Sequence, residues 1–214
     1  MEPRPAATVV VVRPGPRGVE VLMLRRAPDT PFAAGFVVFP GGMVDDADAD
    51  LAERWFDDAG DAARACAVRE LAEEAGLVMG GDGVRLLGPG EDPVEALGAS
   101  PPRMEDIHPM ARWLAPEFLA VRFDAEFFSV GVPDGIEPIP DGREIDRGWW
   151  ARPADVLDEF PLWRALMWPT YRTLEHLASC GTVEEVLALR VEQEMPPPSL
   201  LALRVSPEWQ ERGG

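Results

Sequence analysis

The chain has 214 residues, a hydrophobic fraction of 46% and seven tryptophans, so it can bury a proper core and is not a disordered protein. Its formal net charge of −18 argues against a basic face for nucleic acid, because phosphate contacts need clustered Lys and Arg. A small phosphorylated substrate is not excluded, since divalent cations and a few local arginines can reverse the field inside one cleft.

The cysteines and the N-terminus bear on the compartment. Cys66 and Cys180 are too few for the disulfide framework of a secreted domain. The first residues lack the basic-then-apolar layout of a signal peptide, and the apolar run Ala6–Val12 is too short to cross a bilayer. We therefore expect a cytoplasmic protein that makes no membrane contact.

The N-terminal quarter predicts mainly strands. A β-branched run at Thr8–Val12 and an alternating run at Val19–Leu24 flank a turn-rich Pro-Gly stretch, which indicates a hairpin. Phe36–Phe39 is another short strand, and a Pro-Gly-Gly turn closes it. The acidic stretch Asp45–Asp58 predicts a loop, with a helical turn around Leu51–Phe56.

The best-supported helix covers Gly60–Ala75. Aspartates at positions 57, 58 and 61 suit its N-terminus, where carboxylates complement the helix dipole, and Gly76 suits its C-terminal cap. The following stretch, Gly80–Pro102, is rich in Gly and Pro and predicts a loop crossed by a short strand.

The rest of the chain mixes strands with helices. Strands are expected at Arg112–Leu114 and Phe127–Val130, and Trp149 starts a further segment. Helices are then expected at Pro153–Glu159, Leu162–Ala178 and Val183–Gln193. Strands mixed with a few helices, without strict alternation, indicate an α+β or layered α/β/α domain. We expect one domain over residues 1–195 and a C-terminal tail over residues 196–214.

Three glutamates lie on one face of the Gly60–Ala75 helix. Glu70, Glu73 and Glu74 have the spacing i, i+3 and i+4, at which like charges repel by roughly a few tenths of a kcal/mol per pair. A hard divalent cation makes such a cluster favourable, because Mg²⁺ prefers oxygen ligands. A solvated acidic face would explain the helix alone, but the Pro-Gly-Gly turn adds backbone that can approach a ligand.

This segment resembles the Nudix box, G-x5-E-x7-R-E-U-x-E-E-x-G-U, where U is a bulky aliphatic residue. The second half matches in full from Arg69 to Leu77, and the opening glycine corresponds to Gly42. Gly42 and Arg69 lie 13 residues further apart than in the box, and Asp61 stands where the box glutamate is expected before the arginine. We expect Asp61 to pair with Arg69 or to serve the helix N-terminus. The resemblance implies a Nudix fold, an α/β/α sandwich with a mixed β-sheet and a helical C-terminal extension.

The resemblance also implies a mechanism. Glu70, Glu73 and Glu74 would bind Mg²⁺ or Mn²⁺ against a pyrophosphate, with the Gly42 carbonyl as a further ligand, and water would attack one phosphorus. Arg69 would orient Glu70 by contacting this metal ligand without binding the metal itself.

Residues outside the box are weaker candidates. Nudix enzymes often recruit another acid from a distant loop, and Glu144 is our candidate for that base or ligand. Arg25, Arg26 and Arg122 are candidates for contacts to substrate phosphates. The alternative interpretation is that they form ordinary ion pairs on the surface. A thiol is a poor Mg²⁺ ligand, so Cys66 is expected to pack in the core.

The wider sequence resembles the acyl-coenzyme A diphosphatase branch, in particular the Nudix-19-like proteins, in residues 36–45, 112–117 and 122–128. The coenzyme A signature before the box is incomplete, because Ala34 stands where a histidine is expected. The branch implies CoA or acyl-CoA as the small-molecule nucleotide substrate. NADH, ADP-ribose or a nucleotide sugar is the alternative substrate, and a non-catalytic Nudix-fold binding or regulatory module is the alternative class. A homodimer remains open.

Overall fold

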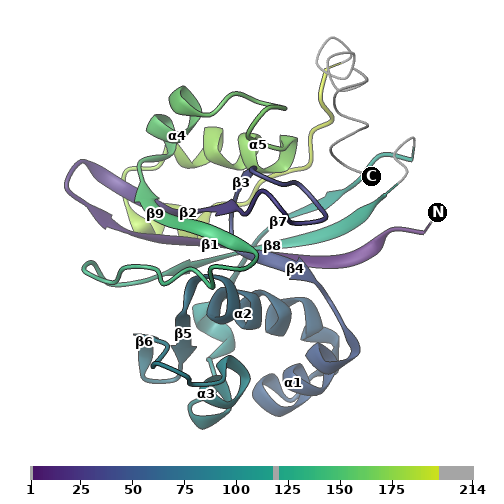
Figure 1. Cartoon of the computed structure of the whole chain (residues 1–214), viewed down its shortest axis with the longest axis vertical. Coiled ribbons are helices and arrows are strands. Elements are labelled where there is room, and N and C mark those ends of the chain that lie inside the picture. The colour runs from purple at the N-terminus through teal and green to yellow at the C-terminus, as the bar shows by residue number, and fades with distance from the viewer. Residues whose placement is uncertain (1, 118–120, 198–214) are drawn as a thin grey trace.

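A mixed seven-stranded β-sheet forms the middle layer of the computed structural model, which describes residues 2–117 and 121–197 (Figure 1). Five strands follow the order β3-β2-β1-β8-β7, with β4 added to β1 and β9 added to β2. The β1–β8 pair is parallel and the other pairs are antiparallel. The strands are β1 (Arg4–Gly15), β2 (Gly18–Arg26), β3 (Val37–Val38), β4 (Gly41–Met43), β7 (His108–Leu114), β8 (Phe123–Gly131) and β9 (Ile145–Ala151).

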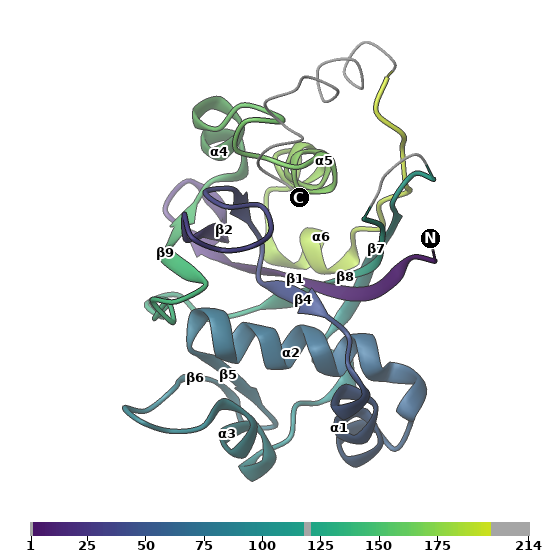
Figure 2. The ribbon, with the colours of Figure 1, turned by 45° about the vertical axis from the view of Figure 1, so that its right-hand side comes forward.

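Helices cover both faces of this sheet, as Figure 2 shows. The lower layer in the figures contains α1 (Asp46–Phe56), α2 (Ala62–Ala75) and α3 (Pro93–Ala99), with the small hairpin β5 (Leu77–Gly80) and β6 (Gly83–Leu86). The upper layer contains α4 (Pro153–Glu159), α5 (Trp168–Leu177) and α6 (Val183–Ala188). Two 3₁₀ turns, η1 (Ala59–Asp61) and η2 (Met104–Asp106), complete the elements. The predicted α/β/α layering is confirmed.

The alternation of β1 explains why both faces are covered. Val9 and Val11 are fully buried in the core on the α2 side, whereas Val10 and Val12 are fully buried in the core on the α5 side. A strand buried on both faces reads as a continuous apolar run, as this one does. The predicted hairpin is confirmed, and Gly18 closes it with a φ of 111°, which L-residues rarely adopt.

The sheet divides where the glutamate helix crosses it. The C-terminal part of β1 pairs with the N-terminal part of β2. At their other ends the two strands separate, so that the N-terminal part of β1 pairs with β4 and the C-terminal end of β2 pairs with β3. The short β3–β4 connection therefore places β4, which contains Gly41 and Gly42, in the middle of the sheet. Helix α2 packs against β4 and β1, so the Pro-Gly-Gly turn and the glutamates meet.

Several predicted boundaries are wrong. The predicted loop Asp45–Asp58 is mostly the 11-residue helix α1, which begins at an Asp45–Asp48 capping box. The Gly/Pro-rich stretch after α2 contains the predicted strand as β6, but also α3, which Asp92 caps by accepting from Glu95 N–H. A local capping residue thus outweighed the composition of each stretch.

Helix α4 has the predicted bounds, Pro153–Glu159, but the last two helices are shorter than predicted. Helix α5 starts at Trp168, after a turn in which Trp163 has a φ of 66°, and α6 ends at Ala188. The expected tail lies outside the described residues from position 198 onward. Within residues 2–117 and 121–197, none of the helices combines the length and the apolar composition needed to span a membrane.

Candidate active site and metal centre

The glutamates of helix α2 lie beside the face of the helix that packs into the core. Its core side consists of fully buried apolar residues, among them Val68, Leu71 and Ala72. The helix stops at Gly76, whose φ of 65° places it in the left-handed region and whose N–H donates back to the last turn. The predicted C-cap is therefore confirmed.

The Pro-Gly-Gly turn is in contact with two of the glutamates. The Gly41 N–H donates to Glu74 Oε2 at 3.0 Å. A Cβ added to Gly42 would lie only 2.2 Å from Glu70 Oε1, so this carboxylate occupies the space that any other residue would fill. The absence of a side chain at Gly42 thus lets the β4 backbone approach the carboxylate directly.

Arg69 organises the first half of the glutamate cluster. Its Nη1 donates to Glu70 Oε1 and to Glu73 Oε2, each at 2.9 Å. Its Nε and Nη2 donate to the two carboxylate oxygens of Asp48 at 2.8 and 3.0 Å, and Asp48 is fully buried. Burial disfavours the charge of Arg69, but the hydrogen bond to Asp48 and the charge of Glu70 outweigh it and raise the arginine pKa.

Asp61 does not pair with Arg69, although it stands at the N-cap position of α2. Asp61 makes no side-chain hydrogen bond to the helix N-terminus and pairs instead with Arg64 at 3.2 Å. Asp48 is the partner of Arg69, and it lies six residues after Gly42, where the box has its first glutamate. The extra residues therefore fall between Asp48 and Arg69, where they form most of α1 and the η1 turn. Counting forward from Gly42 would have found Asp48 from the sequence.

Glu74 is the most enclosed of the three glutamates. It is 5% exposed, and burial raises its pKa to about 8, although the Gly41 N–H and Arg26 favour the ionised form. Arg26 Nη1 lies 3.6 Å from Glu74 Oε1, and Arg26 Nη2 lies 3.3 Å from Glu144 Oε2. The structure thus brings the predicted residues Arg26 and Glu144 to the glutamate helix.

The other two predicted arginines have different partners. Arg25 forms a two-pronged pair with Asp146 at 2.8 and 2.9 Å, and Arg122 Nε donates to the Ala115 carbonyl at 3.1 Å. Neither contact involves a box glutamate. Cys66 is buried as expected, with its Sγ 3.4 Å from the Met43 carbonyl, and burial raises the pKa of its thiol.

The donor chemistry fits a hard divalent cation. Three carboxylates on one helix face supply oxygen ligands of the kind that Mg²⁺ and Mn²⁺ prefer. Across residues 2–117 and 121–197, however, no three acidic, His or Cys side chains converge into a ready coordination sphere. Arg69 and Arg26 hold the carboxylates instead. The carboxylates are thus held in place by arginines, and their oxygens do not converge on a common point.

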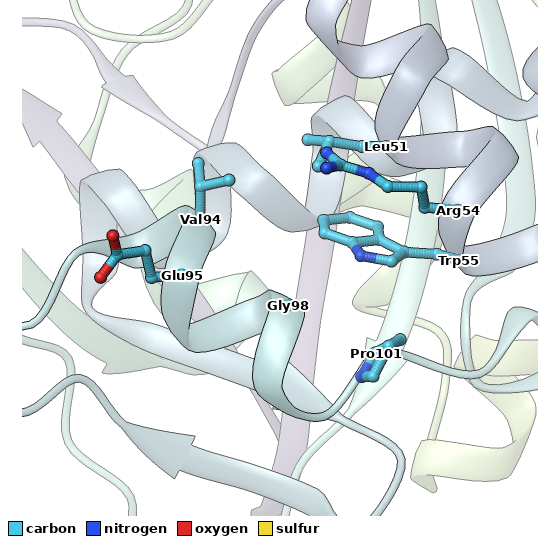
Figure 3. A pocket seen from close by; sticks show the side chains of 7 residues that line it. All are labelled: Leu51, Arg54, Trp55, Val94, Glu95, Gly98 and Pro101. Carbon is cyan, nitrogen blue, oxygen red and sulfur yellow. The ribbon is translucent and has the colours of Figure 1, made fainter.

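A separate hollow of about 380 Å³ lies between α1 and α3 (Figure 3). Its wall contains none of the box glutamates, so it is not the candidate active site. The lining residues are Leu51, Arg54, Trp55, Val94, Glu95, Gly98 and Pro101.

Residues 2–174 match the NUDIX domain family, and the chain belongs to that family. A solved NUDIX hydrolase from Alicyclobacillus acidocaldarius is 31% identical, with a TM-score of 0.77, over 89% of this chain and 98% of that one. A Caenorhabditis elegans protein described as a nudix hydrolase is 41% identical over 75 residues, which are 35% of this chain and 22% of that protein. The chain is accordingly classed with the hydrolases of this family.

Proposed function

We propose that the protein is a metal-dependent hydrolase that cleaves the pyrophosphate of a nucleoside diphosphate-linked substrate, CoA or acyl-CoA, by attack of water on phosphorus. The observation that carries this proposal is the placement of Glu70, Glu73 and Glu74 on one face of α2, with Glu70 and Glu74 directly against the glycines of β4. Carboxylates gathered against a backbone without side chains suit a phosphate held through a cation.

The proposed ligands of Mg²⁺ or Mn²⁺ are Glu70, Glu73 and Glu74, with the Gly42 carbonyl as a further donor. When bound, the cation would neutralise phosphate oxygens, acidify the attacking water and stabilise the leaving phosphate. Arg69 positions Glu70 and Glu73 by donating to both, and its own orientation is fixed by the buried Asp48.

Glu144 is our candidate base. Its side chain is 65% exposed, so it can reach a water or substrate, and its pair with Arg26 keeps it beside the buried Glu74. A base must come within hydrogen-bond reach of the proton that it accepts. An exposed carboxylate at the edge of the site meets that requirement better than the enclosed Glu74 does.

The surroundings of Arg26 support a substrate with an apolar arm. Phe32 is 39% exposed and packs edge-on against Phe123 with ring centroids 5.4 Å apart, while its carbonyl accepts from Arg26 Nε. An aromatic pair whose Phe32 ring is exposed, and which is connected through Arg26 to Glu74, suits the pantetheine or acyl part of CoA substrates. Phosphate contacts by Arg25 and Arg122 remain predictions.

The deciding experiment is a panel of CoA, dephospho-CoA, acyl-CoA, NADH and ADP-ribose, each with Mg²⁺, Mn²⁺ or EDTA. We expect hydrolysis of CoA compounds that EDTA abolishes. Glu73→Gln should lower turnover by roughly 100-fold or more, since it removes a ligand charge at nearly constant volume, whereas the exposed α6 variant Glu184→Gln should not.

Loss of the 3′-phosphate in dephospho-CoA should lower efficiency by about ten- to a hundredfold, because a charge-assisted contact is lost. NADH cleaved better than CoA would overturn the CoA assignment and leave the hydrolase. A protein that binds Mg²⁺ but cleaves none of these compounds would support the non-catalytic module.

A further inference from the structure

Arg26 connects three parts of the molecule through one guanidinium. Its side chain is only 14% exposed, and its Nε donates to the Phe32 carbonyl at 2.9 Å. Its Nη1 faces Glu74 on α2, and its Nη2 donates to Glu144 in the segment before β9. A planar fork can serve three acceptors in this way, which a lysine ammonium cannot do with the same geometry.

The backbone around Arg26 holds the guanidinium in this place. Arg26 N–H donates to the Phe36 carbonyl at 2.9 Å, and its carbonyl accepts from Gly35 N–H at 3.1 Å. The next residue, Ala27, donates to the Glu144 carbonyl at 2.7 Å. Both ends of the 27–36 loop and the Glu144 segment are thus fastened to the end of β2.

Glu74 has little freedom to accept another partner. Its Oε2 accepts from the Gly41 N–H, its Oε1 faces Arg26, and the residue is 5% exposed. A cation that took Oε1 would come close to the guanidinium. Two positive charges in a partly desolvated site repel far more strongly than they would in water.

The two arginines of the site differ in how firmly they are held. Arg69 makes a two-pronged pair, at 2.8 and 3.0 Å, with the fully buried Asp48. Arg26 approaches Glu74 through one nitrogen at 3.6 Å, beyond hydrogen-bond distance. Arg26 is therefore the partner that a metal can displace from its glutamate.

We propose that Arg26 is an internal counter-cation of the glutamate cluster. It holds Glu74 and the Glu144 segment together before metal binds, and it competes with the divalent cation for Glu74. This inference rests on the proposed metal site and deepens it. Arg26 is in this view a positioning residue, whose presence weakens metal binding while it keeps the site assembled.

The test measures the Mg²⁺ dissociation constant by titration calorimetry and the melting temperature with and without Mg²⁺. We expect the neutral variants Arg26→Met and Arg26→Gln to melt lower than wild type in EDTA, but to bind Mg²⁺ about threefold or more tightly. Arg26→Lys keeps the charge, so its affinity should stay near that of wild type. Gln can still donate to the Phe32 carbonyl, which protects against loss of folding.

Arg13 offers a matched control. Its side chain is 13% exposed, and it joins β1 through the Ile136 carbonyl and Glu137 to the segment between β8 and β9, which also contains Glu144. None of these partners is a box glutamate. Arg13→Met should also lower the melting temperature in EDTA, while its Mg²⁺ affinity stays within about twofold of wild type. This control separates general destabilisation from competition at Glu74.

Unchanged or weaker Mg²⁺ binding in both neutral Arg26 variants would overturn the inference, as would an equal gain in Arg13→Met. Those results leave the proposed metal site intact as long as Mg²⁺ binds wild type. Absence of Mg²⁺ binding to wild type would instead refute the metal site itself, and the role of Arg26 with it.

Discussion

At the scale of single residues, the Asp48–Arg69 pair determines how the glutamates are presented. A fully buried aspartate fixes the guanidinium with two hydrogen bonds, and the remaining nitrogen reaches Glu70 and Glu73. Because Asp48 holds this arginine from the core side, the guanidinium keeps a fixed position for its two half-buried partners. Both carboxylates are therefore oriented by a contact that lies outside the cluster itself.

We predict that Asp48→Asn lowers the free energy of unfolding by about 1.5–3 kcal/mol, the range for hydrogen bonds to charged groups. The loss stays below that of a fully orphaned charge because Arg69 keeps Glu70 and Glu73. Asp61→Asn should cost less than about 1 kcal/mol, since its pair with Arg64 is local. Urea unfolding checks both values, and equal losses would contradict the assignment of Asp48.

Gly42→Ala should impair activity more than stability. The new Cβ would meet the far end of the Glu70 side chain, which can turn away, so the carboxylate moves while the fold remains. We expect turnover to fall by roughly tenfold or more, with less than about 1 kcal/mol of stability lost. Gly98→Ala, in open space on α3, should change neither turnover nor metal dependence. A fully active Gly42→Ala protein would remove Gly42 from the site.

At the scale of elements, the extra residues between Asp48 and Arg69 form a helix rather than a loose loop. Helix α1 packs against α2, and Leu51 and Ala52 join Ala65 in a small core of their own. Asp48 sits in the first turn of α1. The inserted residues therefore continue the helix that begins around Asp48, the partner of Arg69, instead of interrupting the box.

Helix α2 should respond to metal as a unit. Binding to the native state alone stabilises it, and the cation relieves repulsion among Glu70, Glu73 and Glu74. We expect millimolar Mg²⁺ to raise the melting temperature of wild type more than that of Glu70→Gln, measured by calorimetry. Equal shifts in the two proteins would place the cation elsewhere.

At the scale of the whole molecule, the site is assembled from parts far apart in the sequence. Arg26 ends β2, Gly41 and Gly42 belong to β4, and Glu144 precedes β9. The sheet brings them together because β2 pairs with β9 while β1 holds β4 against α2. A chain with a net charge of −18 thereby concentrates a buried arginine, Arg69, and a half-buried one, Arg26, at one acidic cluster.

Glu74 should make the metal-free protein less stable at high pH. Burial raises its pKa from the ordinary 4.5 to about 8, so the folded state holds this proton after the unfolded state has released it. The stabilisation is complete below about pH 4.5 and is lost as pH rises through about 8. The melting temperature in EDTA should therefore fall less from pH 5 to 9 (roughly the titration window) for Glu74→Gln than for wild type. Parallel curves would contradict this.

The sequence by itself determined the local features. The spacing of Glu70, Glu73 and Glu74, the Gly76 cap and the β1–β2 hairpin all follow from periods and turn residues within a few positions of each other. Helix α1 was also within reach, since its capping box is local, but acidic composition concealed it.

Only the tertiary structure decided which charges meet. The choice of Asp48 over Asp61 depends on how α1 packs on α2, and the contact of Arg26 with Glu74 and Glu144 depends on the pairing of β2 with β9. The sequence offers 20 basic residues and 38 acidic ones. Because an ion pair acts over a few ångströms, its partners are set by distances across the sheet and not by separation along the chain.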